Sequence, residues 1–296
     1  MLHGRSTAVS GKRLTPDDKE EREKRLQEEE EAVAQERREA GKNLLMYQPN
    51  KGEDFWGVDK AMHIGEDEIV YSAYRGSTMP AILYLPAFDA PSDDAKAEHI
   101  RAYCAKEDYP FISMDWYGVG KSSGDFSKGT ISRWKQDTFT LIRRLLPHSS
   151  EQVVIVGGGV GGWIATLIAA EMPEKVAGLV GLAADPDFTE NLLLRYLPKA
   201  TLDKIEDEGV AMVTWGRSTY PVSKALLDDG RANLVLQGPA GKLKVSCPVR
   251  LVHGLDDEEV PYTVSLDLAR RVGSTEVNLY LVKVSSLLSH EDVRWW

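Results

Sequence analysis

The sequence has little cysteine and no long apolar run. Its two cysteines, Cys104 and Cys247, lie far apart among 296 residues, so we expect two buried thiols in a reducing compartment and no disulfide. No stretch approaches the roughly 18 apolar residues of a membrane-spanning helix, and no secretory signal is visible. The formal net charge of −10 disfavours nucleic acid as a main partner, because phosphate binding requires a basic face.

The six histidines and two cysteines also match no metal-ligand spacing, so the sequence predicts no metal site and no cofactor. His253 follows a predicted strand, and we interpret it as a structural residue. Ser122 and Ser123 lie in a loop near the predicted strand ends, where we expect them to stabilise the loop and to take no part in catalysis.

Residues 1–45 differ in composition from the rest of the chain and are predicted to form a charged extension, most of it one long helix over 16–41. Acid and base alternate there at i, i+4 spacing, and the apolar residues Leu26 and Val33 are isolated. A helix that is polar all round projects into solvent or lies against another molecule. Residues 1–15 are basic and free of acid, which is typical either of a weak organellar transit peptide or of a disordered terminus.

Residues 46–296 are predicted to form one α/β domain. After an expected irregular bridge over 42–65, apolar strand patterns alternate with helical ones, which indicates a mostly parallel sheet flanked by helices. Residues of about 184–247 interrupt this alternation and predict a helical cap inserted over the strand ends. The expected strands are 68–74, 81–85, 111–115, 152–156, 177–182, 249–253 and 277–282, and the expected helices are 94–105, 131–146, 162–171 and 262–272.

The stretch 157–161 is the most informative part of the sequence. A buried strand precedes it and a helix follows, which is the context of the G-x-S-x-G nucleophile elbow of hydrolases. Here the pattern is G-x-G-x-G, so Gly159 stands where a catalytic serine is expected. A glycine at an elbow relieves backbone strain once no side chain is required.

Several further motifs resemble the α/β-hydrolase superfamily, and within it the small serine esterases that include the mitochondrial palmitoyl-protein thioesterase and acyl-glucuronide esterase branch and its bacterial relatives. The resemblance runs from about residue 68 to 293. Residues 85–89 (LPAFD) resemble the family's oxyanion loop, residues 114–124 (MDWYGVGKSSG) its glycine-rich turn, and residues 253–261 its H-G-x-x-D-x-x-V-P motif. The resemblance implies the α/β-hydrolase fold and a mitochondrial location, with a cytoplasmic location as the alternative.

The resemblance also assigns the catalytic positions. It places the nucleophile at Gly159, the acid at Asp257 and the histidine at or beside Ser286, while His290 falls about four residues late. The backbone N–H groups of Val160 and Phe88 would form a residual oxyanion hole. Two of three triad groups are therefore absent, and in subtilisin the loss of serine or histidine alone costs about 10⁶ in turnover.

Three functional hypotheses follow. The first is a catalytically inactive accessory subunit of a larger, mitochondrial protein complex, with Leu26, Val33, Trp295 and Trp296 as interface candidates, since tryptophan is enriched at binding hot spots. The second is a non-catalytic protein that binds an acyl ligand in a residual pocket. The third is a residual esterase or thioesterase with a rearranged site. The sequence alone favours the first and predicts no enzyme activity.

Overall fold

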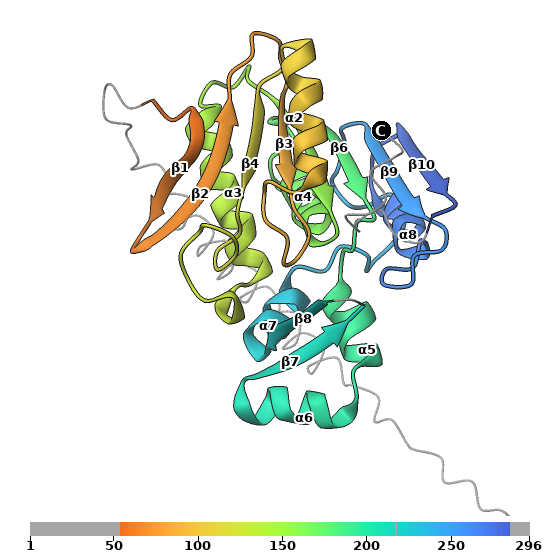
Figure 1. Cartoon of the computed structure of the whole chain (residues 1–296). Coiled ribbons are helices and arrows are strands. Elements are labelled where there is room, and N and C mark those ends of the chain that lie inside the picture. The colour runs from red at the N-terminus through yellow and green to blue at the C-terminus, as the bar shows by residue number, and fades with distance from the viewer. Residues whose placement is uncertain (1–53, 217, 285–296) are drawn as a thin grey trace, which may run out of the picture. The chain divides into compact units, whose positions relative to one another are not determined.

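The computed structural model describes residues 54–216 and 218–284 (Figure 1). The charged extension predicted over 1–45 lies outside these residues, as do its interface candidates Leu26 and Val33. Within the described part, an eight-stranded sheet has the strand order β1-β2-β4-β3-β5-β6-β9-β10. Strand β1 is antiparallel to β2, and β2 is antiparallel to β4. The remaining neighbours, from β4 to β10 in this order, pair in parallel. The expected α/β-hydrolase architecture is confirmed.

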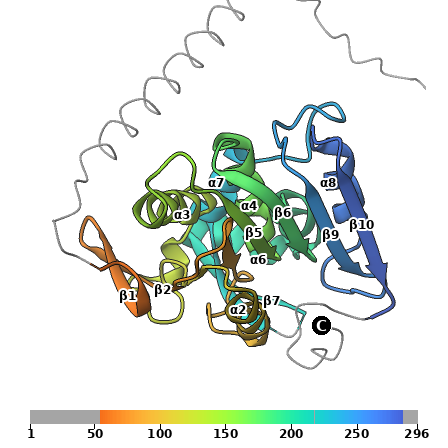
Figure 2. The ribbon, with the colours of Figure 1, turned by 90° about the horizontal axis from the view of Figure 1, so that it is seen from above.

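Helices cover both faces of the sheet. Figure 2 shows α2 on one face, and α3, α4 and α8 on the other. The strands are β1 (Gly57–Ile64), β2 (Asp67–Tyr74), β3 (Ala81–Leu85), β4 (Phe111–Met114), β5 (Val153–Gly158), β6 (Val176–Leu182), β9 (Val249–Gly254) and β10 (Val277–Val282), and the helices are α2 (Ala95–Glu107), α3 (Ile131–Leu145), α4 (Val160–Glu171) and α8 (Thr263–Arg271).

The central helix α4 is apolar nearly all round and almost completely buried, as expected for a helix packed between a sheet and its neighbours. Helix α3 is amphipathic instead. The side chain of Thr130 accepts a hydrogen bond from the backbone N–H of Arg133 at its start, and Arg143 and Arg144 lie in its last turn, where positive charge favours the helix dipole. These two helices and α8 enclose the larger core cluster, and α2 covers a smaller one.

The segment between β6 and β9 lies across the carboxyl ends of the parallel strands, at the bottom of Figure 1. The expected helices are present, and the structure adds a two-stranded antiparallel sheet that the sequence analysis did not predict. The elements are the π-helical turn η2 (Thr189–Leu193), α5 (Leu194–Tyr196), α6 (Lys199–Glu208), β7 (Val210–Trp215), β8 (Ser218–Ser223) and α7 (Lys224–Ala232). We refer to this segment as the cap.

A second correction concerns the bridge expected to be irregular over 42–65. Its described end forms β1, which pairs with β2 as an antiparallel edge strand. Most side chains of β1 are exposed or half-buried. Such a strand shows little hydrophobic alternation because only one of its edges and little of its surface are covered.

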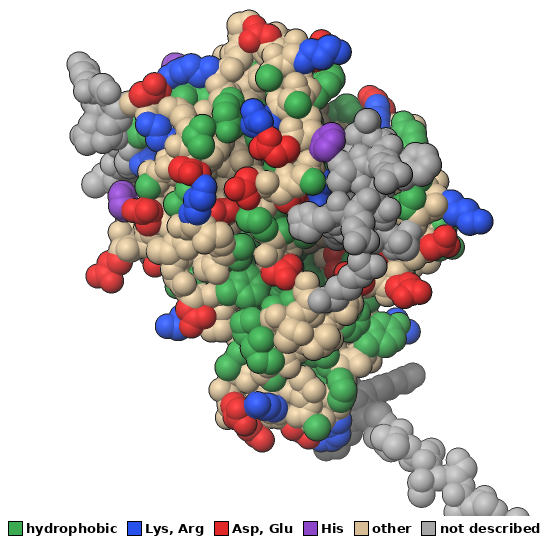
Figure 3. Space-filling view, in the orientation of Figure 1, with side chains coloured by type: hydrophobic (Ala, Val, Ile, Leu, Met, Phe, Trp, Pro, Cys, Tyr) green, Lys and Arg blue, Asp and Glu red, His purple; other side chains and the backbone are tan. Residues whose placement is uncertain are grey.

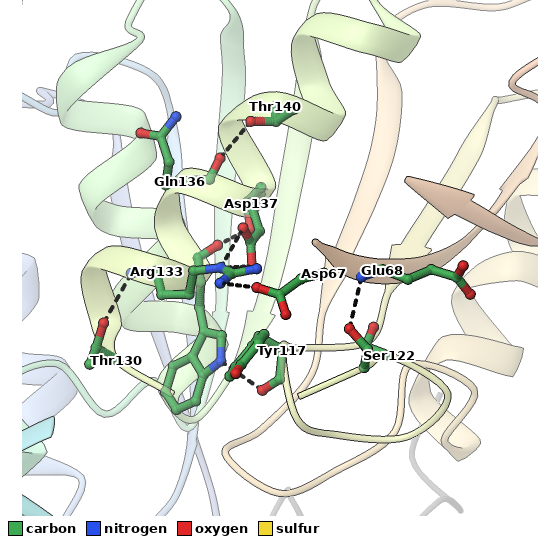
Figure 4. A network of polar contacts seen from close by, with 12 residues as sticks. Asp67, Glu68, Tyr117, Ser122, Thr130, Arg133, Gln136, Asp137 and Thr140 are labelled. Carbon is green, nitrogen blue, oxygen red and sulfur yellow. Dashed lines mark hydrogen bonds and ion pairs between the residues drawn. The ribbon is translucent and has the colours of Figure 1, made fainter. Parts of the chain in front are cut away.

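A half-buried arginine, Arg133, ties β2 to α3 through ion pairs with one carboxylate on each element. Nε of Arg133 donates to both carboxylate oxygens of Asp137 at 2.9 Å, and Nη1 donates to Asp67 at 2.8 Å (Figure 4). The guanidinium carbon lies 4.3 Å from the centre of the Tyr117 ring. Asp137 is fully buried, and this burial raises its pKa to about 6 although Arg133 opposes the shift.

Candidate active site

The elbow is present in the backbone. Strand β5 ends at Gly158, α4 begins at Val160, and Gly159 between them has φ 51° and ψ −121°. A glycine adopts this positive φ without the steric cost that a Cβ adds. The turn is also tight, because a Cβ on Gly161 would lie 2.3 Å from the carbonyl oxygen of Leu85. The first turn of α4 is therefore packed directly against the loop that follows β3.

The two predicted oxyanion donors lie in the two segments that this packing joins. Val160 is the first residue of α4, and Phe88 lies in the loop after β3. Among the described residues, neither backbone N–H donates to any acceptor. Unengaged N–H groups at a helix start, where the helix dipole is positive, can stabilise a developing oxyanion.

Asp257, the predicted acid, lies in the loop after β9 and is buried. Its Oδ1 accepts hydrogen bonds from the backbone N–H groups of Glu259 at 3.0 Å and Val260 at 2.9 Å. Its Oδ2 is buried and has no hydrogen-bond partner in the part of the chain that the structure describes. Burial raises the pKa of Asp257, and the two N–H groups partly offset this shift.

Asp185, which the sequence analysis missed as a site residue, lies just beyond the end of β6. Its backbone N–H donates to the carbonyl oxygen of Gly159 at 3.0 Å. Its side chain is buried, and Oδ1 has no partner among the described residues. Burial, followed by the charges of Asp257 and Asp187, raises the pKa of Asp185 well above its usual range. An aspartate directly after a buried parallel strand was the available signal, since such strand ends gather at one edge of a sheet.

His253 is unavailable for proton transfer in this arrangement. Its Nε2 lies 2.8 Å from the carbonyl oxygen of Val260, and Nδ1 lies 2.7 Å from Oγ of Ser265. The carbonyl can only accept, so Nε2 carries the proton and Nδ1 accepts from the serine hydroxyl. Burial lowers the pKa of His253 and favours this neutral form. The interpretation of His253 as a structural residue agrees with these contacts.

The other reactive side chains are also accounted for. Oγ of Ser122 accepts from the N–H of Val70, and Oγ of Ser123 accepts from the N–H of Glu68, so both hold the loop against β2. Cys104 and Cys247 are free and buried, as expected, and burial raises the pKa of Cys104 to about 11. A thiol with so high a pKa is a poor nucleophile.

An aromatic cluster joins the elbow to the cap. The ring of Phe88 lies 4.9 Å from Phe126, 5.6 Å from Trp134, 5.2 Å from Phe188 and 4.8 Å from Tyr220, all in edge-on geometry. Phe188 and Tyr220 belong to the cap region, and the other two rings belong to the main body. Figure 3 shows hydrophobic side chains gathered where the cap meets the strand ends.

Some predicted positions fall outside the described residues. Ser286, assigned to the position of the histidine, is among them, together with His290 and the interface candidates Trp295 and Trp296. Within residues 54–216 and 218–284, no three His, Cys, Asp or Glu side chains are grouped so that they could hold a metal ion. No helix in those ranges is long and apolar enough to span a membrane.

Comparison with known proteins decides the family. The mitochondrial palmitoyl-protein thioesterase ABHD10 of Bos taurus is 31% identical over 222 residues, which is 73% of this chain and 69% of that protein. Its Homo sapiens counterpart is 30% identical over 220 residues, again 73% of this chain and 69% of that protein. The chain belongs to this α/β-hydrolase family. A family model for hydrolases, described as serine aminopeptidase S33, matches residues 94–204.

Solved structures agree with this membership. A putative hydrolase from Agrobacterium vitis superposes with a TM-score of 0.70 at 26% identity and covers 77% of this chain and 89% of its own. The mouse α/β-hydrolase domain-containing protein 10 superposes with a TM-score of 0.69 at 26% identity, and the match covers 79% of this chain and 92% of the mouse chain. The chain is therefore a hydrolase-family protein related to a thioesterase.

The prediction that the protein is not an enzyme is corrected by these comparisons, because the matched family model describes hydrolases and the relatives are named as thioesterases. The sequence argument gave the loss of two triad side chains more weight than the residual oxyanion hole and the acid that it also predicted. A hydrolase site also contains its elbow backbone, its oxyanion donors and its acid. The structure has the elbow backbone at Gly159, and the predicted donors Val160 and Phe88 and the predicted acid Asp257 are present in the described chain. The absence of one serine excludes the acyl-enzyme route through that serine and leaves other routes open.

Proposed function

We propose that the protein is a mitochondrial hydrolase of fatty acyl thioesters or esters, in which water takes the place of the serine nucleophile. The observation that carries this proposal is the elbow itself, which keeps the backbone of a hydrolase around a residue without a side chain. Gly159 has φ 51° and ψ −121°, and the N–H groups of Val160 and Phe88 are not engaged by other described residues. The rearranged site would thus differ from that of the family in its nucleophile.

The chemistry requires a water nucleophile, donors for the oxyanion and a base that accepts the proton of the water. A water molecule adds to the carbonyl carbon, the carbonyl oxygen takes the developing negative charge, and the bond to sulfur or oxygen then breaks. The N–H groups of Val160 and Phe88 would stabilise the oxyanion. The free Oδ2 of Asp257 would accept the proton of the attacking water. In a protease without its triad, oxyanion stabilisation and binding still accelerate the reaction roughly 10³–10⁴-fold over water. We expect a rate enhancement of the same size here, before any contribution from a general base.

The apolar surface around Phe88 supports an acyl substrate. Phe188 and Tyr220 of the cap region pack against Phe88 beside the elbow, and a fatty acyl chain is the substrate part that such a surface would bind through the hydrophobic effect. The relatives are named palmitoyl-protein thioesterases and mitochondrial. These names favour a long-chain acyl thioester as the substrate class and mitochondria as the location of this chain.

The test is hydrolysis by the purified full chain of a p-nitrophenyl ester and a long-chain acyl thioester. We expect measurable turnover of both, and Asp257→Asn should lower the rate by about 100-fold or more, the usual contribution of a general base. Asp256→Asn is the matched control, because Asp256 is the exposed neighbour of Asp257. Absence of hydrolysis by the wild type, or equal rates for the two variants, would contradict the proposal.

A further inference from the structure

Two carboxyl groups without a counter-ion lie together behind the elbow. Asp257 Oδ2 and Asp185 Oδ1 are both buried and both lack a hydrogen-bond partner among the described residues. They come from the ends of neighbouring strands, since β6 pairs with β9. A buried carboxylate without a partner is costly, so an arrangement in which neither group is neutralised by a cation requires another explanation.

The charged groups that act directly on Asp185 are both carboxylates. Burial, followed by the charges of Asp257 and Asp187, raises the pKa of Asp185, and burial, followed by the charges of Asp89 and Asp185, raises the pKa of Tyr220 from β8. Positive charge acts only on the neighbours of Asp185, because His253 lowers the pKa of Asp257 and Arg271 lowers that of Asp187. No lysine or arginine of the described chain contributes to the shift at Asp185. Two like charges at such a site cannot both persist, and one proton shared between them removes the conflict.

We propose that Asp185 and Asp257 form a pair that shares one proton, in which Asp257 accepts a proton from the attacking water and Asp185 donates one to the leaving sulfur or oxygen. This assignment rests on the proposed hydrolase function. Backbone hydrogen bonds decide the division of roles. Two N–H groups bind Oδ1 of Asp257 and favour its ionised form, whereas no hydrogen bond to the side chain of Asp185 is present among the described residues.

The backbone of Asp185 fixes its position relative to the elbow. Its N–H donates to the carbonyl oxygen of Gly159 at 3.0 Å, and this same carbonyl accepts from the N–H of Gly162 inside α4. The side chain therefore starts from a residue that is hydrogen-bonded to the nucleophile position.

The proposed hydrolysis balances in protons and electrons without a cofactor. Water bonds to the carbonyl carbon as its proton moves to Oδ2 of Asp257, and the oxyanion is held by the N–H groups of Val160 and Phe88. When the carbonyl reforms, the bond to the leaving atom breaks, and that atom takes the proton of Asp185. The products are a carboxylic acid and a thiol or alcohol. Transfer of one proton from Asp257 to Asp185 then restores the pair.

The leaving group tests the role of Asp185. p-Nitrophenolate leaves without protonation, whereas an alkoxide needs a proton, so we compare p-nitrophenyl butyrate with ethyl butyrate, which share one acyl group. Asp185→Asn should slow ethyl ester hydrolysis about 100-fold, the typical contribution of a general acid, and change p-nitrophenyl ester hydrolysis by less than about 3-fold. A side chain that only supports the fold would affect both substrates equally.

Infrared spectroscopy supplies a second test that needs no turnover. Wild-type protein at pH 7 should show the carbonyl stretch of a protonated carboxylic acid, and Asp185→Asn should lack it. Asp267→Asn is the control for both experiments, because Asp267 is an exposed aspartate on α8 outside the site, and it should retain the band and both rates. Equal losses on the two esters, or a band that persists in Asp185→Asn, would overturn the pair and leave the proposed function standing. Failure of the wild type to hydrolyse either ester would instead overturn the proposed function.

Discussion

Substitution of Gly159 tests whether water or a side chain at the elbow is the nucleophile. If water is the nucleophile, Gly159→Ser introduces an Oγ at the elbow without a described histidine to activate it, and its Cβ meets a positive φ. We expect the rate of p-nitrophenyl butyrate hydrolysis by Gly159→Ser to stay equal to that of the wild type or to fall. A burst of p-nitrophenol followed by efficient turnover would show that a serine can be activated, and that His290 or another histidine acts as its base.

Arg133 provides a prediction about stability. Removing it leaves the carboxylate of Asp137 fully buried without its cation, and breaking such a pair typically costs about 3–5 kcal/mol. Arg133→Met should therefore lower the free energy of unfolding by about 3 kcal/mol in urea denaturation at pH 7. Arg143→Met is the matched control from the same helix, because Arg143 is exposed, and its loss should change stability by less than about 0.5 kcal/mol. Equal effects would show that the ion pair contributes nothing.

The pH dependence of stability follows from the pKa of Asp137, which burial raises to about 6. The folded state then holds a proton that the unfolded state, with an aspartate pKa near 3.9, has already released. Stability from this group is fully present below the unfolded pKa and is lost as pH rises through 6. Between pH 6 and pH 4.5 we expect the wild type to gain about 2 kcal/mol relative to Asp137→Asn. Parallel pH profiles for the two proteins would contradict this sign.

At the scale of elements, the contact between α4 and the loop after β3 positions the two predicted oxyanion donors relative to each other. A Cβ on Gly161 would lie 2.3 Å from the carbonyl oxygen of Leu85 and 2.5 Å from that of Pro86, both of them backbone atoms. Gly161→Ala should displace this loop, destabilise the fold by about 1–3 kcal/mol and reduce hydrolysis more than 10-fold. Gly178→Ala in β6 is the control, since its Cβ would meet its nearest atom at 3.4 Å. Unchanged turnover by Gly161→Ala would separate the loop from catalysis.

The sequence predicted the elements that bury apolar side chains and missed those that do not. Runs such as 152–156 and 249–253 identified central parallel strands because both of their faces are covered. Strand β1 and the β7–β8 pair were missed because most residues of each strand are exposed or half-buried, and because these strands stand outside the alternation of strand and helix. Their existence depends on a partner strand, which periodicity along one segment does not reveal.

The site was predictable where a local motif carries it. Gly159, Val160 and Asp257 were located from their spacing to neighbouring strands. Asp185 was not, because its importance comes from the charge of Asp257, which lies 72 positions later in the chain and reaches it only through the pairing of β6 with β9. The prediction of no enzyme activity was wrong for a different reason, since it gave the two missing triad side chains more weight than the backbone donors that it also predicted.

At the scale of the whole molecule, protein partners stay a prediction. Strand β10 forms one edge of the sheet, and Tyr280 and Leu281 on it are exposed. An edge strand with exposed apolar side chains is a surface that another chain can cover. In a gentle mitochondrial extract we therefore expect the protein to migrate in a particle far larger than its own 32.9 kDa, with a fixed set of companions identified by mass spectrometry. Migration as a free monomer or dimer would rule out a stable host complex.

The four-ring environment of Phe88 has a consequence for how such a protein could choose its substrates. Phe88, whose N–H would stabilise the oxyanion under the proposed function, also has its ring packed between two rings of the main body and two of the cap region. If the cap opened to admit a bulkier acyl chain, the ring of Phe88 would be displaced and the direction of its N–H group would change. Selectivity for chain length and the electrophilic activation of the ester would then vary together, so that a poorly fitting acyl group is penalised in turnover as well as in affinity.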